Sequence, residues 1–149
     1  MLAVVEERFS DLDRCVHEAA ATSSDAFERL RRAGEAYLDF GRGHRGHYRV
    51  LFGPISGSAL RPGSDRDHPG KAAFSTLVVM VQACIDAAQA DADAFVVAVE
   101  RWAFLHGLVD LHAVCPRFPF PPQAVLAGAW VDRLRVSLES PGDPEPPAG

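Results

Sequence analysis

Apolar residues recur every three or four positions along most of the chain, which is the pattern of helices with one buried face. The first such stripe consists of Leu2, Val5, Phe9, Leu12, Val16 and Ala19. The same spacing predicts five further helices, over residues 24–41, 44–52, 71–90, 94–114 and 123–138. No stretch alternates apolar and polar residues for long enough to predict a strand. The pattern therefore predicts an all-α fold, a bundle of six helices.

Local signals set the expected ends of these elements. Asp25 followed by Glu28 fits a capping box at the start of the second helix, and Gly41 and Gly43 are expected to end or bend it. A loop rich in Gly, Pro and Ser covers residues 53–70. The tail, residues 140–149, carries four prolines with acidic residues and is expected to be disordered. Residues 1–139 are therefore predicted to form one domain.

The last two predicted helices carry more apolar surface than one core can cover. An apolar stripe on each is expected to face a second copy, which would build a four-helix dimer interface. Small residues near Gly128 would let another helix approach closely. The alternative is that all of this surface is internal to the six-helix bundle. The expected interface residues are Phe104, Leu108, Leu111, Leu126, Trp130 and Leu134.

Composition narrows the class of protein. A chain of 149 residues with 48% hydrophobic residues suits one soluble domain, and a net charge of −5 disfavours a nucleic-acid-binding domain. The longest apolar stretch, 72–90, is interrupted by polar residues, and no signal peptide is visible, so we expect a cytoplasmic protein without a membrane span. The cysteines, Cys15, Cys84 and Cys115, are too scattered for a disulfide framework or a zinc knuckle.

Catalytic and metal chemistry find little support, so we expect neither an enzyme nor a metal or cofactor site. The serines at 56, 58 and 64 lack a G-x-S-x-G elbow, and His44 and His47 lack a second ligand pair. Arg42, Arg45 and Arg49 form a basic cluster without a phosphate-binding loop, which leaves a solvated patch or a docking surface as its interpretation.

Two motifs resemble the ligand-binding and dimerisation domain of TetR-type transcriptional regulators. The run 101–111, RWAFLHGLVDL, contains a Trp-x-x-x-His-Gly signature, and the run 47–53, HYRVLFG, contains a His-Tyr-Arg-x-x-Phe-Gly signature. Trp102 and His106 share a helix face and would form part of a pocket wall, although a packed core histidine beside a tryptophan is the alternative. The familiar second motif has Pro where this chain has Arg45, so the local turn is expected to differ.

The resemblance implies a pocket for a small, largely apolar effector, and a dimer formed through the last two helices. It also implies that the basic cluster lies toward a DNA-binding unit. Each residue of the expected pocket could instead belong to the plain core. The expected pocket residues are Tyr37, Phe40, Tyr48, Phe52, Met80, Cys84, Trp102 and His106.

Regulators of this type read DNA with an N-terminal helix-turn-helix, whereas residues 1–20 are acidic and lack a recognition helix. We therefore expect no operator binding by these residues themselves. A misplaced start codon, a genuine remnant, or pairing with a full-length relative would each account for this. The expected function is effector sensing and dimerisation within a TetR-type repressor, as a homodimer or a heterodimer. The alternative is a stand-alone module that binds small molecules or proteins outside transcription.

Overall fold

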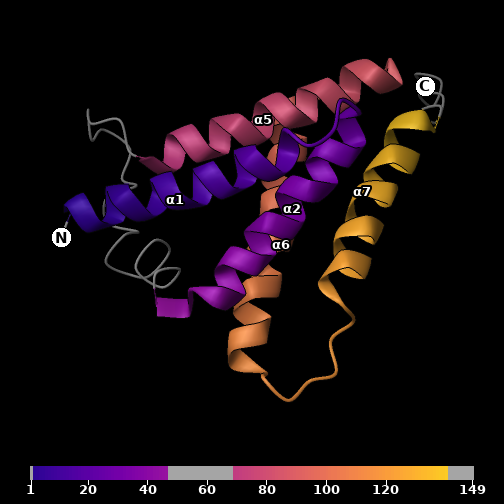
Figure 1. The fold of residues 1–149 in the computed structure, drawn as a ribbon. Helices are drawn as coiled ribbons and strands as arrows, with labels where there is room; N and C mark the ends of the chain where they lie inside the picture. The colour runs from indigo at the N-terminus through magenta and orange to yellow at the C-terminus, as the bar shows by residue number, and fades with distance from the viewer. Residues whose placement is uncertain (1, 47–68, 141–149) are drawn as a thin grey trace, which may run out of the picture.

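Five helices make up the part of the chain that the computed structural model describes, residues 2–46 and 69–140 (Figure 1). They are α1 (Leu2–Ala20), α2 (Ala26–Gly43), α5 (Pro69–Ala88), α6 (Ala94–Val114) and α7 (Gln123–Glu139). Within these two ranges there is no strand, which confirms the all-α prediction. The sixth helix, predicted over 44–52, falls mostly outside the described residues, although residues 45–46 are helical. The described count is therefore five rather than six.

The helices α2 and α5 each contact every other described helix. The helix α1 runs beside α5 and packs most extensively on α2, while α6 descends behind α2 and α7 rises from the connector below (Figure 1). The helices α6 and α7 touch each other at few places, because α6 rests on α5 and α2 while α7 rests mainly on α2. They therefore form an open V that is joined at its lower end.

The core lies where α2, α5, α6 and α7 meet, and α1 adds Leu12 and Ala20 to it. Burial of each large apolar side chain there contributes about 1.5–3 kcal/mol. The largest fully buried side chains are Trp130, Leu30, Leu38, Val81 and Cys84.

Aspartate caps fix where two of these helices begin. The Asp25 carboxylate accepts a hydrogen bond from the Glu28 amide at 2.7 Å, which confirms the expected start of α2. The Asp93 carboxylate accepts from the amides of Phe95 and Val96 at 2.9 and 3.2 Å at the start of α6.

Two glycines within α2 allow neighbouring helices to approach it closely. A Cβ atom on Gly34 would lie 2.6 Å from the Trp130 ring of α7, and one on Gly41 would lie 2.6 Å from Val109 of α6. The prediction that Gly41 ends the helix is wrong, because α2 continues through it, whereas Gly43 is the last residue of α2 as expected. Gly41 is instead a contact point for α6.

The helix α7 ends at Glu139, and the predicted tail lies almost entirely outside the described residues, so the boundary of the domain remains a prediction. None of the helices described in residues 2–46 and 69–140 is both long enough and apolar enough to span a bilayer.

Candidate functional site

Aromatic and polar side chains from α2, α5 and α6 meet around Trp102. The Trp102 Nε1–H donates a hydrogen bond to the Tyr37 hydroxyl at 3.3 Å, across the interface between α6 and α2. The Phe74 ring of α5 packs edge-on against Trp102, with 6.0 Å between the ring centroids. Because Trp102 and His106 are one helical turn apart, their rings lie side by side at 5.8 Å. We call Tyr37, Phe74, Trp102 and His106 the aromatic cluster.

The polar atoms of this cluster form a series that leads toward the surface. The Tyr37 side chain is buried, Trp102 is half-buried, and the His106 side chain is 29% exposed. The His106 Nε2 atom lies 3.4 Å from the carboxylate of Asp110, which is 60% exposed. The arrangement therefore joins an apolar interior to solvent through three groups that can donate or accept hydrogen bonds.

The other predicted pocket residues do not all join this cluster. Phe40 and Met80 are buried, and the Phe40 ring stacks on His44 at 4.8 Å near the end of α2. Tyr48 and Phe52 lie outside the described residues.

Cys84 is fully buried, and desolvation, with a smaller effect of the Asp25 charge, raises the pKa of its thiol to about 12. Its thiol is therefore neutral at physiological pH.

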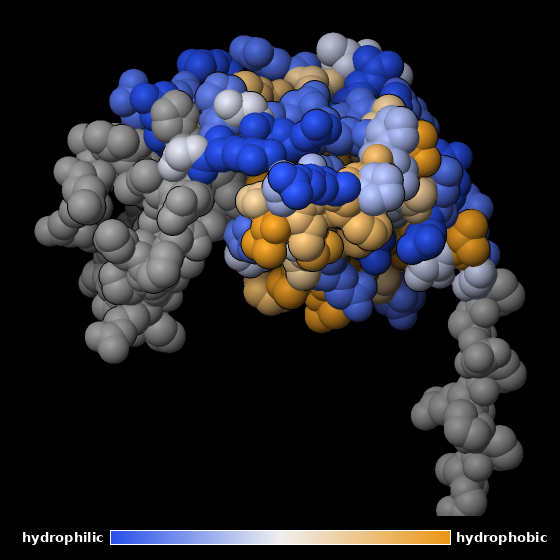
Figure 2. All heavy atoms as spheres, turned by 90° about the horizontal axis from the view of Figure 1, so that it is seen from below, coloured by the Kyte–Doolittle hydropathy of each residue, from blue (hydrophilic) through white to orange (hydrophobic). Residues whose placement is uncertain are grey.

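A second candidate site is the outer face of α6 and α7, where apolar side chains meet solvent. Leu111 and Val114 of α6 are 50% and 78% exposed, and Val125 and Val136 of α7 are 57% and 64% exposed. Apolar residues gather on one side of the molecule in Figure 2, opposite a mainly hydrophilic side. Exposed apolar patches of this kind mark interaction sites.

The predicted interface residues divide between this face and the core. Phe104 and Leu111 are exposed, and Leu108 and Leu126 are half-buried. Trp130 and Leu134, at 2% and 3% exposure, are enclosed by this chain itself and offer a partner almost no surface. The stripe of α7 that remains free is the one that carries Val125 and Val136.

The half-buried cation of Arg101 links the two helices of the V. A terminal Arg101 nitrogen (Nη1) donates a hydrogen bond to the Trp130 carbonyl oxygen at 3.1 Å. Burial lowers the pKa of the Arg101 guanidinium, because desolvation disfavours its charged form. Its Nε atom is buried without a hydrogen-bond partner among the described residues. Arg101 therefore ties α6 to α7 at a point where few other contacts join them.

In residues 2–46 and 69–140, no three His, Cys, Asp or Glu side chains are close enough together to hold a metal ion.

Comparison with known proteins identifies the class. The family described as "Tetracyclin repressor-like, C-terminal domain" matches residues 30–134, and the chain belongs to this family.

A solved structure shares the fold. It is described as "Structure of a protein with unknown function from Rhodococcus sp. RHA1", and it aligns with a TM-score of 0.78 at 23% sequence identity. The alignment covers 93% of this chain and 71% of that one. No curated protein matches the sequence.

Proposed function

We propose that this chain is the effector-binding and dimerisation domain of a TetR-type transcriptional repressor that acts in the cytoplasm. In the proposed regulator, a helix-turn-helix unit contacts DNA, and this domain controls it in response to a small, largely apolar molecule. The observation that carries the proposal is the hydrogen bond from Trp102 to Tyr37 inside the aromatic cluster. It places polar groups among apolar rings between three helices, as a pocket for an apolar ligand with one polar anchor requires.

The effector is proposed to lie against the aromatic cluster, with its polar group near Tyr37 and His106. Phe40 and Met80 remain candidates for the deeper wall of the pocket, as do Tyr48 and Phe52 for a side outside the described residues. Cys84 remains a candidate as well, as a fully buried side chain of α5. Because the cluster joins α2, α5 and α6, a ligand there would change how these helices pack.

Dimerisation is proposed to use the free face of α6 and α7. Phe104 and Leu111 would lie at its centre, and Val114, Val125 and Val136 would extend it. Trp130 and Leu134 would support this face from behind. The partner is a second copy or a full-length TetR-type relative, since a face that is complementary to itself is complementary to close relatives as well.

Ligand binding tests the sensor proposal. Thermal unfolding of the 149-residue chain would be followed with 1-decanol and 4-nonylphenol, which are apolar molecules with one hydroxyl group. A ligand at about 100 times its Kd stabilises the fold by about 2.7 kcal/mol, which is a rise of several degrees in Tm. Tyr37→Phe, which removes only the hydroxyl, and His106→Gln should weaken binding roughly threefold to tenfold.

The matched control is His17→Gln on α1, where the histidine side chain is 55% exposed and far along the chain from the cluster. It should leave binding unchanged. Equal binding by Tyr37→Phe, His106→Gln and the control would show that the ligand does not use the cluster. Failure of both alcohols and of other apolar ligands to raise Tm would remove the support for a sensor.

A further inference from the structure

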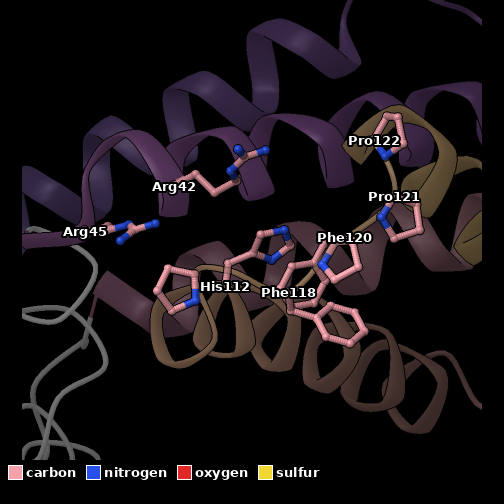
Figure 3. Close-up of a pocket in the computed structure, with 9 residues that line it drawn as sticks. Arg42, Arg45, His112, Phe118, Phe120, Pro121 and Pro122 are labelled. Carbon is pink, nitrogen blue, oxygen red and sulfur yellow. The ribbon is translucent and has the colours of Figure 1, made fainter.

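A cavity of about 390 Å³ lies between the end of α2 and the connector that joins α6 to α7 (Figure 3). Arg42 and Arg45 line it on the α2 side, and His112 lines it from α6. The connector residues Pro116 and 118–122 form the facing wall. The volume lies within the range of pockets that hold small molecules.

The cavity is positive although the chain as a whole carries a charge of −5. None of its nine lining residues is acidic. Neither Arg42 nor Arg45 forms an ion pair with any residue that the structure describes. The His112 Nδ1 atom lies 2.7 Å from the Leu108 carbonyl oxygen and can donate to it. Two planar guanidinium groups that have no acidic partner among the described residues therefore line the cavity.

The facing wall is apolar and offers almost no hydrogen-bond donors. The Phe120 ring stacks on His112, with 3.9 Å between centroids and 22° between planes, and Phe118 packs against Phe120 at 4.6 Å. Four prolines at 116, 119, 121 and 122 carry no N–H group. The Phe118 and Phe120 amides already donate to the carbonyl oxygens of Cys115 and Phe118.

An arginine fork binds a carboxylate or a phosphate through its paired N–H groups. Many phosphate sites add several backbone N–H groups, whereas the Phe118 and Phe120 amides of this wall already have acceptors. The wall therefore favours an anion that needs few donors beyond the two arginines. The rings of Phe118 and Phe120, with the prolines, would cover a flat apolar body attached to that carboxylate.

We propose that this cavity binds a small organic carboxylate with a flat, apolar body, such as an aromatic acid. Arg42 and Arg45 hold the carboxylate, and the connector packs on the ring of the ligand. The site is separate from the aromatic cluster, since His112 lies six residues beyond His106 on α6. It therefore accepts a ligand of different charge from the proposed effector.

Isothermal titration calorimetry with 2-naphthoate tests the proposal on the full chain. Arg42→Gln and Arg45→Gln should each weaken binding about tenfold or more, because each removes a charged hydrogen-bond donor. Arg29→Gln is the matched control, since Arg29 is an exposed arginine on the same helix outside the cavity, and it should leave Kd unchanged. Phe118→Ala, at a side chain that is 60% exposed, should weaken 2-naphthoate but not acetate. Neutral 2-naphthamide and inorganic phosphate should each bind at least tenfold more weakly than 2-naphthoate.

Four outcomes would overturn the proposal. The first is no heat at about 10 mM 2-naphthoate, where even a ligand with a Kd of about 1 mM would nearly saturate the site. The second is unchanged binding in the Arg42→Gln/Arg45→Gln double variant. The third is equal affinity for phosphate or 2-naphthamide. The fourth is loss of binding in Trp102→Phe with retention in Arg42→Gln, which would place the acid in the aromatic cluster instead.

Discussion

Glycines inside α2 and glycines on the V of α6 and α7 have opposite surroundings. A Cβ atom on Gly34 or Gly41 would meet a side chain of a neighbouring helix at 2.6 Å. A Cβ atom on Gly107 of α6 or Gly128 of α7 would meet nothing within 4 Å. A glycine within a helix costs about 1 kcal/mol relative to alanine. Within α2 that cost is offset by close packing, whereas the single chain offers Gly107 and Gly128 no such compensation.

The difference agrees with the proposed position of a second chain. Gly107 lies between Phe104 and Leu111 along α6, and Gly128 lies between Val125 and Val136 along α7, so each accompanies exposed apolar residues. A flat, small-residue position beside apolar side chains permits another helix to approach closely. The proposed dimer would thus give these two glycines the packing that Gly34 and Gly41 find within the chain.

The largest expected effect follows from placing a charge on the free face. Leu111→Glu should raise the dimer dissociation constant roughly hundredfold or more, because each protomer would bury an unpaired carboxylate. The fold should persist, since Leu111 is 50% exposed in the single chain. Sedimentation velocity would show a species of one chain mass, 16.1 kDa, in place of one of twice that mass.

Val79→Glu is the control for this substitution, because Val79 is 69% exposed on α5, outside the V. It should leave the dimer unchanged. A dimer that persists in Leu111→Glu would show that the free face of α6 is not the interface.

The next largest effect is expected at Gly34, where α2 packs closely against α7. Gly34→Ala should lower the free energy of unfolding by about 1–3 kcal/mol, because its methyl group would overlap the Trp130 ring. Urea unfolding followed by tryptophan fluorescence would measure the change. A higher free energy of unfolding in Gly34→Ala would mean that α7 can move away from α2 to make room for the methyl group.

In a single chain, Gly128→Ala should change the free energy of unfolding in the opposite direction to Gly34→Ala. In a Leu111→Glu background, where the chain is expected to be monomeric, it should raise the free energy of unfolding by up to about 1 kcal/mol. In the wild-type background it should weaken the dimer, because the methyl group would occupy space meant for the partner. A lower free energy of unfolding of the monomer in Gly128→Ala would contradict the open surroundings that distinguish Gly128 from Gly34.

The smallest effect concerns the outer face of α2, which charge rather than packing stabilises. Glu28 accepts hydrogen bonds from Arg31 at 2.6 and 2.8 Å and from Arg32 at 2.8 Å, and these lower its pKa from 4.5 to about 2. A lowered pKa in the folded state stabilises the fold above pH 4.5, and that contribution is lost as pH falls from 4.5 to 2. Glu28→Gln should therefore reduce the loss of stability in this pH range.

Chemical unfolding at a series of pH values would measure how steeply the free energy of unfolding falls between pH 4.5 and pH 2, which is the slope compared below. Glu18→Gln is the control, since Glu18 is exposed on α1 and forms no ion pair with a described residue, and its slope should match that of the wild type. A slope in Glu28→Gln equal to that of the control would show that these ion pairs are fully screened by solvent.

Periodicity and capping predicted the helices well, because both are local properties of the chain. The predicted range 94–114 coincides with α6, and the aspartate caps begin α2 and α6. The role of Gly41 was missed, since a glycine in a helix can mark an end or a crossing point, and only the position of α6 decides between them. The family resemblance, carried by the motif around Trp102 and His106, was confirmed.

The sequence did not predict which face of α7 is buried or that a cavity forms, because both depend on contacts between distant segments. Both stripes of α7 are apolar, so the sequence did not indicate that Trp130 faces the core while Val136 faces solvent. The cavity needs the prolines of the connector to fold back beneath Arg42 and Arg45, which are more than seventy residues away. No spacing rule within either segment predicts that encounter.

The open V has a consequence for how this domain could transmit a signal. Its two arms rest on different supports, α6 on α5 and α2, and α7 mainly on α2, and they meet each other mainly at Arg101 and the connector. A molecule that wedges α2 away from α5 would therefore change the opening angle of the V rather than move it as one block. In the proposed dimer, a partner chain that contacts both arms would undergo a rotation, and the V would then act as a hinge between the interior of one chain and the orientation of the other.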